Sequence, residues 1–74
     1  MIAIEKNILE ALVELDDTVK GMAAANPKPD LQPLFARLGE LERQLPRDAD
    51  PNLRHYLQRK SYEKARLLLQ GREG

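Results

Sequence analysis

The sequence predicts an all-α protein, a small three-helix bundle in which residues 1–74 form a single helical domain. Leu, Ala, Glu, Lys and Arg dominate the chain, β-branched residues are sparse, and no stretch alternates apolar and polar residues with a period of two. Apolar residues instead recur at spacings of three and four, and prolines separate the helical stretches. We therefore expect an antiparallel helical hairpin followed by a third helical region.

The first helix is expected to run from Ile2 to Ala24 or Ala25, because Asn26 precedes Pro27 and the residue before a proline disfavours helix. Its apolar residues include a heptad seam that would face the bundle: Ile8, Leu12, Leu15, Val19 and Met22. A second apolar stripe lies about 120° around the helix and consists of Ile2, Leu9 and Val13. A helix with two apolar stripes usually contacts two neighbours, so the second stripe is a candidate interface.

The second helix is expected over residues 31–45. Asp30 is a suitable N-cap, Pro33 is tolerated in the first turn, and Pro46 ends the helix. Its apolar residues share one face, which Phe35 widens: Leu31, Leu34, Leu38, Leu41 and Leu45.

The third helical region is expected from Pro51 to Gln70, with Asp50 as N-cap and Gly71 as C-cap. Leu53, Tyr56 and Leu57 define its apolar face at the start, which on a straight helix would continue through Lys60 and Lys64. Lysines in a core-facing stripe are costly. We therefore predict a break or sharp kink near Ser61, with Ser61 capping a short last helix. The alternative is one continuous helix whose apolar face spirals.

The predicted core combines apolar residues from all three regions. It consists of Ile8, Leu12, Leu15, Val19, Leu34, Phe35, Leu38, Leu41, Leu45, Leu53, Leu57, Leu68 and Leu69.

The chain of 74 residues is near the lower limit for folding on a single core. It has no cysteine and one histidine, so disulfides, thiolate sites and His/Cys zinc sites are excluded, and we expect no metal or cofactor. Association with another chain is the remaining source of stability. We expect a homo-oligomer or a complex with another helical protein.

Charge is balanced overall but uneven along the chain, with an acidic start and a basic end. The two ends are expected to attract each other, either within one chain or between subunits. No apolar run is long enough to span a membrane, and the N-terminal residues do not form a secretory signal, so a cytoplasmic protein is expected.

Catalytic constellations are missing from the sequence. Thr18 is far from His55 in sequence, and a helix would place Ser61 on a different face from His55. The four glycines are scattered singly, which excludes a glycine-rich phosphate loop. The sequence therefore predicts a protein without catalytic residues, not an enzyme.

A basic set in the last third of the chain is the candidate for anion or nucleic-acid contact: Arg54, His55, Arg59, Lys60, Lys64 and Arg66. Overall neutrality and the long acidic turn before Pro51 argue against a nucleic-acid reader. The leading hypothesis is a non-catalytic helical interaction or self-association module that uses Ile2, Leu9 and Val13. The alternative is weak nucleic-acid or anionic-ligand binding through the basic set.

Overall fold

Four helices make up most of the chain in the computed structural model, which describes residues 2–22 and 30–73. They are α1 (Ala3–Gly21), α2 (Gln32–Arg43), α3 (Pro51–Gln58) and α4 (Tyr62–Glu73). These two ranges contain no strand, so the all-α prediction is confirmed, with the third helical region divided into two helices. The predicted end of the first helix at Ala24 or Ala25 lies outside the described residues.

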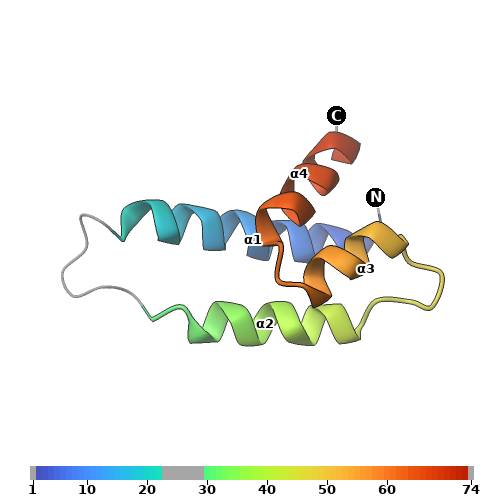
Figure 1. The fold of residues 1–74 in the computed structure, drawn as a ribbon, viewed down its shortest axis with the longest axis horizontal. Helices are drawn as coiled ribbons and strands as arrows, with labels where there is room; N and C mark the ends of the chain where they lie inside the picture. Colours follow the sequence, from blue (N-terminus) through green and yellow to red (C-terminus); the bar gives the residue numbers. More distant parts are fainter. Residues whose placement is uncertain (1, 23–29, 74) are drawn as a thin grey trace.

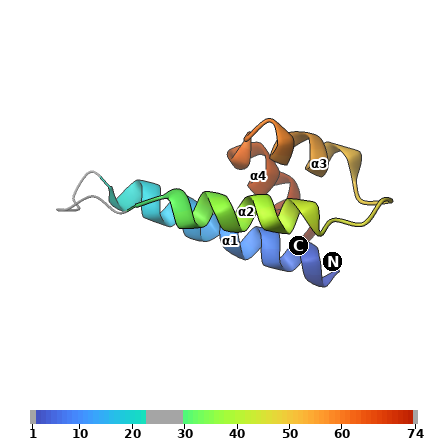
Figure 2. The same ribbon diagram turned by 90° about the horizontal axis from the view of Figure 1, so that it is seen from below.

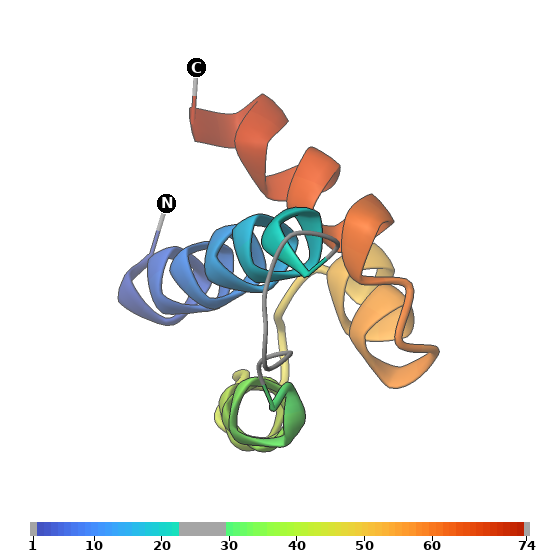
Figure 3. The ribbon, with the colours of Figure 1, turned by 90° about the vertical axis from the view of Figure 1, so that its left-hand side faces the viewer.

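The helices form an antiparallel hairpin with a second, smaller pair packed against it. α1 and α2 run side by side along the long axis, and α3 and α4 follow at the end of the hairpin nearer the N-terminus (Figure 1). α1 contacts α2 and α4, whereas α3 contacts α2 and α4. Viewed along the hairpin, α1 lies between α2 and α4 (Figure 3). The other end of the hairpin extends beyond the smaller pair (Figure 2).

The core lies where all four helices meet. Its buried residues are Ile8, Leu9, Ala11, Leu12, Leu15, Leu38, Leu41, Leu45, Leu53, Leu57, Ala65 and Leu69. Leu34 and Leu68, which were predicted as core residues, are half-buried and pack against this cluster. Ala11 and Ala65 are fully buried, although the predicted core contained neither of them.

Two predicted core residues are exposed, which corrects the sequence-based assignment. Val19 is 48% exposed and Phe35 is 42% exposed. Both continue the apolar faces of their helices, but they lie beside the start of α4, where Tyr62 stacks on Phe35 and lines a cleft with Val19, and this contact covers each of them only in part. Helical periodicity selects the face of a residue, and burial also requires a neighbour to cover that face.

The start of α3 follows the predicted cap, and the start of α2 does not. The Asp50 carboxylate accepts a hydrogen bond from the Asn52 amide at 2.8 Å, directly before α3 begins at Pro51. The helix α2 begins at Gln32 with Leu31 as its N-cap, so the prediction of Asp30 as N-cap is wrong, although the Asp30 carboxylate accepts a hydrogen bond from the Gln32 amide at 3.0 Å. Both carboxylates therefore satisfy amide groups that the first helical turn leaves without partners.

The third helical region is interrupted between Gln58 and Tyr62, where the positions of Lys60 and Lys64 predicted a break. α3 ends at Gln58, and α4 begins at Tyr62. Lys60 has φ of 58° in the left-handed region, the Lys60 amide donates to the Leu57 carbonyl at 3.1 Å, and the Ser61 amide donates to the Tyr56 carbonyl at 2.8 Å. These two bonds form a Schellman motif, with a lysine at the position that glycine usually occupies. The predicted break is confirmed.

The ends of the last helix differ in detail from the prediction. The Ser61 carbonyl accepts the first helical bond from the Ala65 amide at 3.0 Å, whereas the hydrogen bonds of the described residues include none from the Ser61 hydroxyl. α4 continues through Gly71 to Glu73, so the prediction of Gly71 as a C-cap is wrong. Gly71 keeps a negative φ and lies inside the helix.

The acidic start and the basic end of the chain meet within the protomer. Arg72 of α4 donates to the Glu5 carboxylate of α1 at 2.7 Å and also pairs with the Asp50 carboxylate before α3. The Glu5 and Asp50 side chains are only 12% and 17% exposed. One arginine therefore joins three parts of the fold that are far apart in sequence.

Candidate protein-interaction surface

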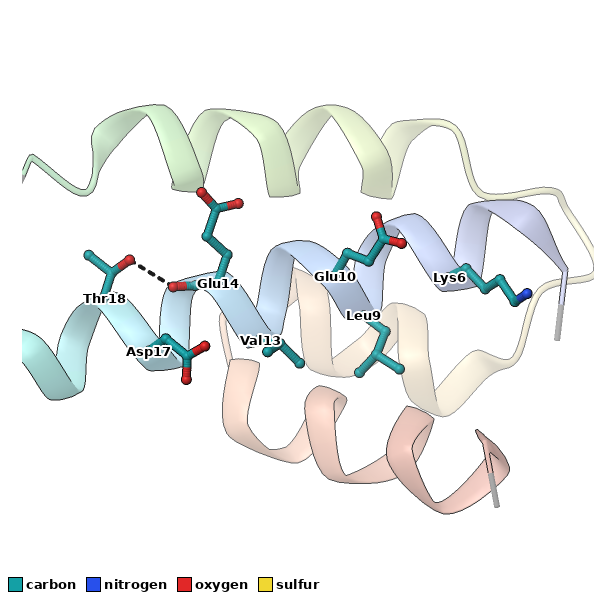
Figure 4. Close-up of a pocket in the computed structure, with 7 residues that line it drawn as sticks. All are labelled: Lys6, Leu9, Glu10, Val13, Glu14, Asp17 and Thr18. Carbon is teal, nitrogen blue, oxygen red and sulfur yellow. Dashed lines mark hydrogen bonds between the residues drawn. The ribbon is translucent and has the colours of Figure 1, made fainter.

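A groove of about 590 Å³ runs along one side of α1 (Figure 4). The ribbon of α2 lies along one side of the groove and that of α4 along the other (Figure 4). We call this the outer groove, and its lining residues are Lys6, Leu9, Glu10, Val13, Glu14, Asp17 and Thr18.

Helical spacing places these residues on one face. Glu10, Val13 and Asp17 follow one another at steps of three and four, so their side chains are neighbours along α1. Leu9 and Val13 provide the apolar floor of the outer groove, and carboxylates line much of its rim. The arrangement suits the apolar face of a partner helix that carries positive charge.

The three residues of the predicted second apolar stripe differ in burial and in position. Leu9 is only 6% exposed and belongs to the core, while Val13 is half-buried and packs against it. Ile2 lies just before α1, is 51% exposed, and is not part of the outer groove. The structure thus brings Leu9 and Val13 together in the groove. The acidic rim was missed, although the spacing of Glu10, Val13 and Asp17 could have revealed it.

The carboxylates of the outer groove differ in their partners. Glu14 pairs with Arg37 of α2 at 3.3 Å, and its carbonyl accepts a hydrogen bond from the Thr18 hydroxyl at 2.7 Å (Figure 4). Glu10 and Asp17 take part in none of the ion pairs of the described residues. Within the described residues, these two carboxylates add negative charge to the rim of the outer groove that no ion pair offsets.

Only part of the predicted basic set has side chains that are free of hydrogen bonds within the described residues and exposed for contact with an anion. The Arg54 guanidinium donates to the Pro46 carbonyl at 2.5 Å, and the Arg66 guanidinium donates to the Gln70 side chain at 3.1 Å. The other members of the set are exposed: His55, Arg59, Lys60 and Lys64. Two of the six predicted contacts are therefore engaged within the fold.

A second apolar surface lies beside the start of α4. The rings of Phe35 and Tyr62 stack with their centroids 5.9 Å apart, and a cleft of about 230 Å³ separates Val19 of α1 from this end of α4. Burial raises the pKa of the Tyr62 hydroxyl, and the Glu42 carboxylate adds to this effect. On the rim of the cleft, the hydrogen bond from Lys20 lowers the pKa of Asp16.

Other kinds of site find no support in the described part of the chain. Within residues 2–22 and 30–73, no three His, Asp or Glu side chains gather as metal ligands do. None of the helices described there is long and apolar enough to cross a membrane. No protein-family model, curated protein or solved structure matches the chain. The residues of the protein itself therefore carry the functional argument.

Proposed function

We propose that this protein is a non-catalytic helical interaction module that binds a partner helix in its outer groove. The observation that carries the proposal is the combination of an apolar floor, Leu9 and Val13, with a rim on which Glu10 and Asp17 form no ion pair with another described residue. An isolated apolar residue on a helix surface needs no explanation, but an apolar groove with charge of one sign along its rim resembles an interface.

The partner follows from this chemistry. A helix that fits the groove places a large apolar side chain over Val13 and basic side chains against the carboxylates. Its binding weakens as salt concentration rises, because the attraction of exposed charges is screened. A cytoplasmic setting is part of the proposal, because a chain without cysteine suits a reducing compartment.

Site-specific photo-crosslinking tests the proposal. A photoreactive amino acid replaces Lys6 in the outer groove or, as the matched control, Arg43 on the exposed side of α2. In extract of the source cells, we expect the Lys6 position to yield a discrete protein adduct that Val13→Lys abolishes and that the Arg43 position does not yield. Equal adducts from both positions, or an adduct that Val13→Lys leaves unchanged, would contradict the proposal.

The alternative hypothesis, anion or nucleic-acid binding, has less support from the geometry. Arg54 and Arg66 are engaged within the protomer, which leaves Arg59, Lys60 and Lys64 as exposed cations around the turn between α3 and α4. A salt-dependent shift of duplex DNA or of RNA at low ionic strength, lost in Lys64→Glu, would favour this alternative.

A further inference from the structure

The exposed face of α4 has the properties that the outer groove requires. Leu67 is 55% exposed, the largest exposed fraction among the large apolar residues described. Lys64 lies three residues before it and Gly71 four residues after it, so the three share one side of the helix. We call Lys64, Leu67 and Gly71 the α4 outer face. The core contacts of α4 lie on its other side, at Ala65 and Leu69.

We propose that the outer groove of one copy of this protein binds the α4 outer face of a second copy. The inference rests on the proposed function and names its partner. Leu67 supplies a large apolar side chain that can pack over Val13 in the groove. Lys64 supplies a positive charge that complements the carboxylate of Asp17. Gly71 carries no side chain, and an added Cβ there would meet no atom of its own protomer within 4 Å, so the α1 of another copy can approach closely at this position.

Charge also sets the orientation of the two helices. The outer groove has Lys6 at its N-terminal end, whereas Glu14 and Asp17 lie toward its C-terminal end. In an antiparallel arrangement, Leu67 lies over Val13 and Lys64 lies near Asp17 and Glu14. A parallel arrangement would place Lys64 at the level of Glu10, one helical turn from Lys6, so Lys64 would meet one carboxylate and a nearby like charge instead of two carboxylates. Glu63, four residues before Leu67, lines the separate cleft near Val19 together with Arg66.

Each copy carries both surfaces, so the contact joins different parts of two copies. It either is made twice in a two-fold dimer or continues into a longer assembly. Association through α1 and α4 also suits the small size of the chain, because further apolar surface is removed from water.

A charge exchange followed by sedimentation velocity tests this proposal. At tens of micromolar and low salt, we expect the wild-type chain to sediment as a dimer or a larger species. Lys64→Glu and Asp17→Lys should each weaken association roughly tenfold, because each places like charges opposite each other. An equal mixture of the two variants should associate again, because the exchanged charges are complementary between them.

Matched controls lie in the exposed loop before α3. Arg47→Glu and Asp48→Lys make the same changes in charge away from both surfaces, and they should leave association unchanged. A second pair of variants tests the apolar contact. Leu67→Ala should weaken association and preserve the fold, whereas Leu68→Ala should lower stability because Leu68 packs against the core of its own protomer.

Three results would overturn the proposal: a monomeric wild-type chain, equal weakening by the loop variants, or a mixture of Lys64→Glu and Asp17→Lys that stays monomeric. In each of these cases, a crosslinked partner of another kind at the Lys6 position would still support the proposed function. Loss of that adduct as well would contradict both the proposed function and the proposed self-association.

Discussion

The two sides of α1 have the same helical backbone and different tasks. The inner side places Ile8, Ala11 and Leu12 against the other helices, and all three are fully or almost fully buried. The outer side carries Lys6, Glu10, Val13 and Asp17 around an open groove. Substitutions on the inner side should therefore change stability, and substitutions on the outer side should change binding. Matched substitutions on the two sides test this division between stability and binding.

Leu12→Ala should have the largest effect, because Leu12 is buried at the centre of the core. Leucine-to-alanine changes at such sites cost about 3–5 kcal/mol, which is comparable to the whole stability of a domain of this size. We expect the variant to be largely unfolded by circular dichroism and urea denaturation. Val13→Ala is the neighbouring control and should cost less than about 1 kcal/mol. Equal losses would mean that the outer side supports the fold as much as the inner side does.

Arg72→Ala should have the next largest effect. It leaves the largely buried carboxylates of Glu5 and Asp50 without their cation, and we expect a loss of about 1–3 kcal/mol in the free energy of unfolding. Arg37→Ala breaks the more exposed pair with Glu14 at the outer groove and should cost less than about 1 kcal/mol. A larger loss for Arg37→Ala would place the stabilising charges on the outer side of α1.

Lys60→Gly should stabilise the protein, and its effect on the free energy of unfolding should be smaller than that of Leu12→Ala or Arg72→Ala. Lys60 occupies the left-handed region at φ of 58°, where glycine is not strained, so we expect a gain of about 0.5–1 kcal/mol. Lys64→Gly, inside α4, should instead lose about 1 kcal/mol. Urea denaturation of both variants measures the difference. A loss on Lys60→Gly would contradict the account of the turn between α3 and α4.

The sequence was sufficient to predict the helices and the break near Ser61, because caps, prolines and the position of Lys60 are local signals. It did not predict that Val19 and Phe35 are exposed, since that depends on how much of each side chain the start of α4 covers. Leu9 and Val13 were recognised as a second apolar stripe from their spacing. The outer groove required tertiary structure, because its shape depends on where α2 and α4 lie beside α1.

Val13 is the residue whose substitution most directly separates binding on the outer side of α1 from stability on its inner side. Val13→Lys keeps helix propensity, gains attraction to Glu10 and Asp17 within α1, and places a positive charge on the floor of the outer groove. Sedimentation velocity and circular dichroism of the same sample measure its association and its fold. We predict a spectrum and an unfolding midpoint close to those of the wild-type chain, with association lost. An unfolded variant, or a folded one that associates as the wild-type chain does, would contradict the division between the two sides of α1.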